Sequence, residues 1–263
     1  MHTPKREWFA RFGIATKGLI YILVGVLIVM GVLGLGGEKS GLTGMLNFFG
    51  KSILGKALLL FIAVGMSGYV FWRLYQTFID RSENGFNLKG IMNRLSYLST
   101  AIFYGVVGFT ALKVFLLSSS GSKKALQNLV GTLLEKPKGQ LLVCILGAIF
   151  LGNAIFQFYV AFSGIFKKDI RIKGITAQQQ KFLLRTGLVG FVARGLTIGA
   201  IAYLLFLSAY TANSAAAGGT EDAFEFLQNV FGPYALIALA SGLLAYGFFL
   251  LIKSYFREIN VDQ

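Results

Sequence analysis

The sequence predicts an all-α integral membrane protein with six transmembrane helices, arranged as three parallel two-helix repeats. Hydrophobic residues make up 55% of the chain, charged residues only 14%, and the mean hydropathy is +0.67. Soluble domains carry about 25% charged residues. Six apolar runs each have roughly the 20 residues that a helix needs to cross a hydrocarbon core of about 30 Å. Related sequence stretches also recur along the chain at nearly constant spacings.

The six apolar runs are the predicted transmembrane helices. Backbone groups in lipid must be hydrogen-bonded within their own segment, so an open chain crosses as helices. None of the runs alternates polar and apolar residues as the strands of a membrane barrel do. The first run is longer than a signal-peptide core and lacks a small-residue cleavage site, so we expect it to be retained. The runs cover residues 14–35, 57–79, 97–117, 141–162, 188–210 and 234–252.

Three copies of one two-helix unit account for the six runs. The second helices carry GMSGYVFWRLYQ, IFLGNAIFQFYV and GLLAYGFFLLIK, which begin at residues 65, 149 and 242. The first helices carry RFGIATKG, RLSYLSTA and LVGFVARG, which begin at residues 11, 94 and 188. The shift in numbering from copy one to copy three is identical in the two helices, and the shift from copy one to copy two differs between them by a single residue. Such regular spacing is typical of internal repeats.

We therefore expect a single membrane domain over residues 1–263, with repeats at 9–80, 91–164 and 184–257. Two helices return the chain to the same side of the membrane, so the copies are parallel and related by an axis along the membrane normal. This predicts a compact bundle with pseudo-threefold symmetry. A linear row of helical hairpins is the alternative.

Short amphipathic helices are expected in the outer loops. In the third outer loop, Phe224, Leu227 and Phe231 fall on one helical face. Thr220 stands directly before Glu221 and a further acid, which is typical of an N-cap followed by an acidic first turn. We expect these helices to lie at the membrane interface.

Orientation follows from the distribution of lysine and arginine. These residues are concentrated in the N-terminal segment, the second and fourth loops and the C-terminal segment. The positive-inside rule then places both termini in the cytoplasm. The net charge of +14 has this membrane explanation, and no recognition motif accompanies it. We expect the lipid bilayer as a partner and no nucleic acid.

The residues needed for several kinds of chemistry are missing from the sequence. With one cysteine and one histidine, no His/Cys cluster for a transition metal or haem is possible. The interiors of the six runs contain no carboxylate of the kind that relays protons in pumps. There is no phosphate-binding P-loop and no G-x-S-x-G motif. We expect no enzyme activity, no cofactor and no metal site.

Cations near the cytoplasmic ends of the runs are the candidate functional residues. Lys17, Arg73 and Arg194 border apolar stretches shorter than the hydrocarbon core. Their side chains either extend to the membrane surface or point into the bundle, where polar groups in spans usually face. Lacking an acid nearby, an inward cluster of cations would bind an anion.

The second helices carry further polar residues on the same face in every copy. This repetition favours the inward orientation and extends the candidate site for an anion or a lipid head group. The additional residues are Tyr69, Asn153, Gln157, Tyr246 and Lys253.

The helix starts of the form R-x-G-x-x-x-[KR]-G and the second helices of the form G-Y-x-x-W-R resemble the bacterial family called domain of unknown function 1206. The resemblance covers almost the whole chain. It implies pairs of membrane helices occurring three times and a bacterial cytoplasmic membrane, and it implies no activity. Copy two departs from the pattern at Ser96, Thr100 and Gln157, so a site built from these positions would be asymmetric.

Two functions follow from these patterns. The first is binding or transport of an anionic lipid, such as an anionic phospholipid, or of a small anion through a cationic site on the cytoplasmic side. The alternative is a structural or assembly protein that docks a membrane protein partner through small-residue helix faces. An intramembrane enzyme is disfavoured because no nucleophile–base pair is recognisable.

Overall fold

The computed structural model of the chain describes residues 4–35, 41–78, 88–117, 125–166 and 176–256. Six of its helices are long and apolar enough to cross a membrane, which confirms the predicted multi-pass helical architecture. These helices are α1 (Pro4–Val32), α3 (Ile53–Phe78), α4 (Leu88–Leu117), α6 (Gly139–Ser163), α7 (Ala177–Thr211) and α8 (Thr220–Phe256).

The loops that join the two long helices of each copy contain the expected short helices. They are α2 (Leu42–Gly50), α5 (Ala125–Leu134), the 3-10 turn η2 (Ser214–Ala216) and the first part of α8. That part of α8 is set off from the spanning part by a break at Gly232, which has a φ of 83°, followed by Pro233. Proline disfavours the helical conformation of the preceding residue, and glycine accepts a positive φ without strain.

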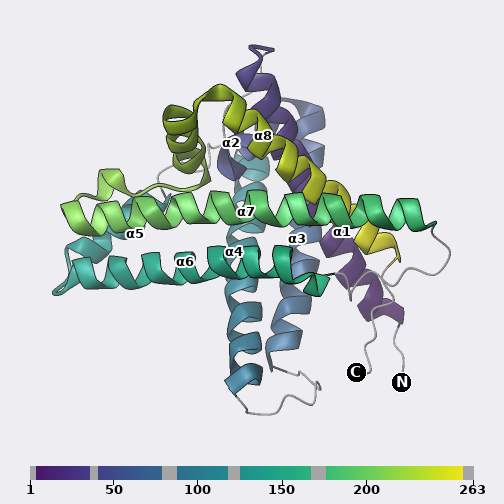
Figure 1. Cartoon of the computed structure of the whole chain (residues 1–263), viewed down its shortest axis with the longest axis horizontal. Helices are drawn as coiled ribbons and strands as arrows, with labels where there is room; N and C mark the ends of the chain where they lie inside the picture. Colours follow the sequence, from purple (N-terminus) through teal and green to yellow (C-terminus); the bar gives the residue numbers. More distant parts are fainter. Residues whose placement is uncertain (1–3, 36–40, 79–87, 118–124, 167–175, 257–263) are drawn as a thin grey trace.

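Helices of different copies pack in a repeating pattern. The second helix of each copy packs against the first helix of the next copy, which pairs α3 with α4, α6 with α7, and α8 with α1. Figure 1 shows α3 and α4 running vertically and α6 and α7 running together across the view. Three equivalent interfaces between three copies are what a pseudo-threefold arrangement requires.

The arrangement is open in copy two. Within copy one, α1 packs on α3, and within copy three, α7 packs on α8. Over the described residues, α4 and α6 of copy two share no comparable interface. The six spans therefore follow the order α4, α3, α1, α8, α7, α6, and the ring is unclosed between α4 and α6.

Close approach of the two helices within a copy depends on glycine. A Cβ atom added at Gly13 would lie 2.6 Å from the Cβ of Tyr69, and one added at Gly190 would lie 2.5 Å from the Cβ of Tyr246. Both are far inside van der Waals contact. Copies one and three use the same contact, since each glycine and each tyrosine occupies the equivalent position of its own repeat. Copy two has Ser96 at the position of Gly13.

A second glycine contact shows the same pattern. A Cβ atom at Gly65 would lie 2.7 Å from the Cβ of Thr16, and one at Gly242 would lie 2.6 Å from the Cβ of Ala193. The corresponding residue of copy two is Ile149, which is exposed. With both glycines replaced, the helices of copy two cannot approach as closely as those of the other copies. This accounts for the opening between α4 and α6.

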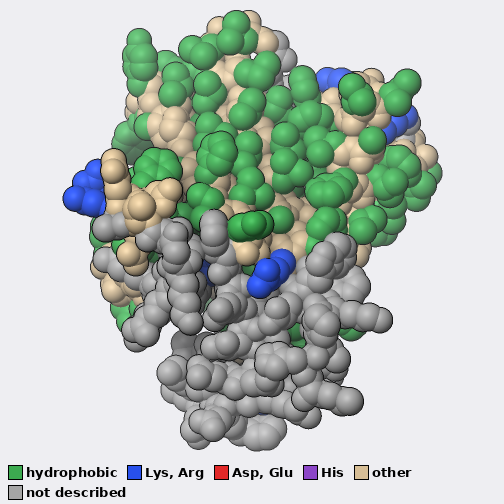
Figure 2. Space-filling view, turned by 90° about the vertical axis from the view of Figure 1, so that its right-hand side faces the viewer, with side chains coloured by type: hydrophobic (Ala, Val, Ile, Leu, Met, Phe, Trp, Pro, Cys, Tyr) green, Lys and Arg blue, Asp and Glu red, His purple; other side chains and the backbone are tan. Residues whose placement is uncertain are grey.

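The larger of two buried clusters lies mainly between α1, α2, α3, α4, α7 and α8, and its largest fully buried side chains include Tyr69, Phe224 and Phe249. The outside is also apolar, with exposed side chains such as Phe71 and Phe109. Figure 2 shows hydrophobic side chains covering most of the described part of one face. An apolar exterior around a packed interior suits a protein surrounded by lipid.

The N-cap of the third outer helix differs from the prediction by one residue. Thr220 is already the first residue of α8, so its assignment as the N-cap is wrong. Gly219 holds that position, because its carbonyl accepts from the Ala223 N–H (3.0 Å) and its own N–H donates to Oδ2 of Asp222 (2.8 Å). The Thr220 hydroxyl oxygen accepts from the Leu42 N–H at the start of α2 (3.3 Å).

Glu221 joins copy three to copy one through the N-terminus of α2. Its Oε1 accepts hydrogen bonds from the backbone N–H groups of Thr43 (2.8 Å) and Gly44 (3.1 Å) in the first turn of α2. A carboxylate at a helix N-terminus satisfies free N–H groups and favours the helix dipole. We expect Glu221→Ala to cost about 1 kcal/mol of stability and to speed hydrogen exchange at Thr43 and Gly44. Glu225→Ala, at an exposed position of the same helix, is the control, and equal exchange in both variants would contradict the prediction.

Candidate functional site

Three of the predicted cations lie in one group with four tyrosines, here called the cation–tyrosine cluster. It comprises Lys17, Arg73, Arg194, Tyr21, Tyr69, Tyr104 and Tyr246. Its members come from α1, α3, α4, α7 and α8. All three copies of the repeat therefore contribute to it.

Lys17 is at the centre of the cluster and is only 8% exposed. Its Nζ lies 4.8 Å from the ring centroid of Tyr104, 5.7 Å from that of Tyr69 and 5.9 Å from that of Tyr246. These are distances at which a cation is attracted by the faces of aromatic rings. Lys17 thus points into the protein, which selects the inward orientation over extension to the membrane surface.

Arg194 makes the shortest polar contact of the cluster. Its Nη1 donates a hydrogen bond of 2.7 Å to the Tyr246 hydroxyl oxygen, and its Cζ lies 4.8 Å from the Tyr246 ring centroid and 5.5 Å from that of Tyr21. Its Nε is buried and has no hydrogen-bond partner among the described residues. A guanidinium offers five N–H donors, so Arg194 retains donor capacity for a further acceptor.

Arg73 makes a comparable contact with the matching tyrosine of copy one, although it lies on the second helix of its copy and Arg194 on the first. Its Nε donates to the Tyr69 hydroxyl oxygen (3.0 Å), and its Nη1 donates to Oε1 of Gln76 (2.9 Å). Its Cζ lies 5.2 Å from the ring centroid of Tyr69 and 5.1 Å from that of Tyr97. Arg73 and Arg194 are both half-buried as whole residues.

The four tyrosines form a frame of two ring pairs that occupy equivalent positions in the repeats. Tyr21 meets Tyr246 edge to face at 5.0 Å, and Tyr104 meets Tyr69 edge to face at 5.2 Å. The two pairs are equivalent, because each joins the second helix of one copy to the first helix of the next. The hydroxyl oxygens of Tyr21 and Tyr104 lie 3.2 Å apart and share a hydrogen bond. The frame therefore holds the cations at an interface between copies.

Two of the predicted site residues form a separate pair on α6. Gln157 is buried, and its Nε2 donates to Oδ1 of Asn153 (3.2 Å), which is exposed. Within the described part of the chain, no contact between this pair and the cluster is found. The opening in copy two explains the separation, since α6 packs on α7 and not on α4. Lys253 is half-buried on α8, and its charge acts on Lys17 together with those of Arg194 and Arg73.

Tyr21, Tyr97 and Tyr104 are the members of this region that the sequence analysis missed. The repeat spacing contained a signal for two of them, because Tyr21 and Tyr104 occupy the same position in the first helices of copies one and two. Tyrosines in an apolar helix resemble ordinary core aromatics, so this signal does not stand out beside that of the charged residues.

The chemistry of the cluster is that of a positively charged, aromatic-lined interior. The described residues that surround its three cations include no carboxylate. Across the described ranges, no group of histidine, cysteine and acidic residues could hold a metal ion. Guanidinium and hydroxyl donors together with an ammonium group are suited to binding oxyanions.

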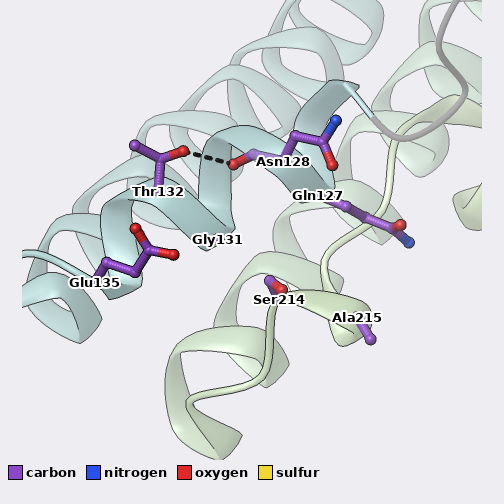
Figure 3. Close-up of a pocket in the computed structure, with 7 residues that line it drawn as sticks. All are labelled: Gln127, Asn128, Gly131, Thr132, Glu135, Ser214 and Ala215. Atoms are coloured by element: carbon purple, nitrogen blue, oxygen red, sulfur yellow. Dashed lines mark hydrogen bonds between the residues drawn. The ribbon is translucent and has the colours of Figure 1, made fainter.

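A hollow beside α5 and η2 lies apart from the cluster. It is lined by Gln127, Asn128, Gly131, Thr132, Glu135, Ser214 and Ala215. Figure 3 shows these residues on α5, directly after its end at Glu135, and on η2, with the Thr132 hydroxyl donating to the Asn128 carbonyl oxygen (3.0 Å). None of the sequence-predicted site residues lines it.

Comparison with known proteins identifies relatives of the chain. The family model described as Domain of Unknown Function (DUF1206) matches three times, at residues 12–80, 95–164 and 189–257. The chain is 30% identical over 261 residues to Uncharacterized protein YxxB of Bacillus subtilis (strain 168), which covers 99% of this chain and 94% of that protein. No solved structure matches. The matches confirm the three-copy organisation, support a bacterial origin and indicate no enzyme family.

Proposed function

The chain belongs to the family described as Domain of Unknown Function (DUF1206), and we propose its function from the geometry of the cation–tyrosine cluster. The protein binds an anion in this cluster, either a lipid head group or a small anion. The observation that carries this proposal is Lys17, an ammonium group that is 8% exposed and surrounded by tyrosine rings. A cation inside a membrane protein is costly and usually functional.

The electrostatics of the cluster favour an anion as its occupant. The charges of Arg194, Arg73 and Lys253 all act unfavourably on Lys17. Cation–π contacts offset part of this, at about 0.5–2 kcal/mol each, but tyrosine rings carry no net charge. An anion among the three cluster cations would neutralise the repulsion and take up the free donor capacity of Arg194.

We place the cluster toward the cytoplasmic side of the bacterial cytoplasmic membrane. The support is the concentration of lysine and arginine beside both termini and in the second and fourth loops. Lys17 and Arg194 lie in the halves of the predicted apolar runs 14–35 and 188–210 that this rule assigns to the cytoplasm. Transport would require that the anion also pass between the copies toward the outer helices.

The alternative, docking of a membrane partner through small-residue faces, is less well supported. The glycines that would form such faces already mediate contacts within the chain, as Gly13 does with Tyr69 and Gly18 with Gly247. Gly152 on α6 has open space around it, but a single small residue makes no packing face.

Native mass spectrometry of the gently solubilised protein tests the proposal. The parent is compared with Lys17→Ala/Arg73→Ala/Arg194→Ala and with a control, Lys113→Ala/Lys136→Ala/Arg185→Ala, which removes three exposed cations. We expect the parent and the control to retain a bound anionic lipid or anion that the cluster variant loses. Identical spectra for all three proteins would overturn the proposal.

A further inference from the structure

The two helices of copy two that lack a mutual interface both adjoin helices of the cluster. On one side of the opening is α4, which supplies Tyr104 to Lys17 and Tyr97 to Arg73. On the other side, α6 packs along α7, which carries Arg194. The ring is therefore unclosed next to the helices that hold the cations, whereas close packing seals the corresponding position in copies one and three.

The two helices that border the opening are the least covered of the six spans. Only 28% of the α4 span and 22% of the α6 span is buried, compared with 39% or more for each of the others. Their exposed side chains are mainly large and apolar, among them Ile102, Phe109, Ile149 and Ile155. Such surfaces are suited to hydrocarbon chains and unsuited to a path for a hydrated ion.

The charge of the cluster limits the chemical class of head group that it can bind. Lys17, Arg73 and Arg194 bring three positive charges together with no carboxylate among the described residues around them. A phosphate diester has one negative charge, whereas a phosphate monoester has about 1.5 to 2 at neutral pH and three acceptor oxygens. The monoester is the better match in charge and in number of acceptors.

We infer that the anion is the phosphate monoester head group of a membrane lipid, and that its acyl chains leave the cluster between α4 and α6. This inference rests on the proposed function and adds the class of ligand and its route. The lipid enters from the bilayer through copy two, where Ser96 and Ile149 replace the glycines that close the other copies.

The first test compares three probes by native mass spectrometry in detergent: phosphatidate, phosphatidylglycerol and glycerol 3-phosphate. We expect phosphatidate to bind about tenfold more tightly than phosphatidylglycerol and glycerol 3-phosphate to bind more weakly still. Lys17→Ala should remove the preference, and Lys113→Ala, at an exposed position of α4, should retain it.

A second test locates the acyl chains. Phosphatidate with a photoactivatable group in its acyl chain is cross-linked to the wild-type protein, with and without an excess of unlabelled phosphatidate. Cross-links that the excess removes should map to α4 and α6. Competed cross-links on α1, α3 or α8 would overturn the route.

The outcomes separate the inference from the proposed function. If glycerol 3-phosphate or phosphatidylglycerol binds as tightly as phosphatidate and Lys17→Ala abolishes the binding, the cluster is an anion site but the inference is wrong. If no probe depends on Lys17 or Arg194, the proposed function fails as well.

Discussion

A Lys17→Met protein is expected to be more stable than the parent when no anion is present, and to lose anion binding. Methionine has a similar length and no charge, so it fills the space among the tyrosines without repelling Arg194 and Arg73. Replacing buried charges by apolar groups is often stabilising. Since a cation at the membrane centre costs about 2.5–3.5 kcal/mol and less near the edge, we expect a gain of about 1–2 kcal/mol.

Thermal unfolding in detergent, with and without added phosphatidate, measures both effects. The parent should be stabilised by the ligand because only the folded protein binds it, and Lys17→Met should show no such shift. Lys113→Met, at an exposed position, should behave as the parent does. A ligand-free Lys17→Met protein that is less stable than the parent would mean that the cation–π contacts outweigh the repulsion, and would contradict the prediction.

Gly13→Ala is expected to be strongly destabilising although it adds one methyl group. The new Cβ would lie 2.6 Å from the Cβ and 2.8 Å from the Cα of Tyr69, so α1 and α3 must separate. Overpacking of this kind costs about 1–3 kcal/mol. The shift would also displace Tyr69 from Lys17 and weaken anion binding. Gly190→Ala should do the same in copy three, where the Cβ would meet Tyr246.

Gly152→Ala is the matched control, because Gly152 lies within α6 and nothing lies within 4 Å of an added Cβ. Alanine is favoured over glycine in a helix by up to about 1 kcal/mol, so this variant should be as stable as the parent or more stable. Unfolding by a denaturing detergent would rank the three variants. Equal stability of Gly13→Ala and Gly152→Ala would contradict the close contact between α1 and α3.

The sequence by itself determined the six spans, their grouping into three copies and the positions of the cations. Hydropathy is a property of each segment alone, so span length can be recognised without knowledge of the neighbouring helices. Repeat spacing can also be read from the sequence alone, and it assigned Lys17 and Arg194, and likewise Tyr69 and Tyr246, to equivalent positions of two copies.

Only the tertiary structure decided which residues of different copies meet. The tyrosines Tyr21 and Tyr104 come from first helices of two copies, and their contact depends on how those copies pack. The same packing separates Gln157 from the cluster, although its repeat position matches that of Arg73. Periodicity describes one face of one helix, whereas the closure of the ring depends on whether close contacts such as that of Gly13 with Tyr69 form between the two helices of a copy.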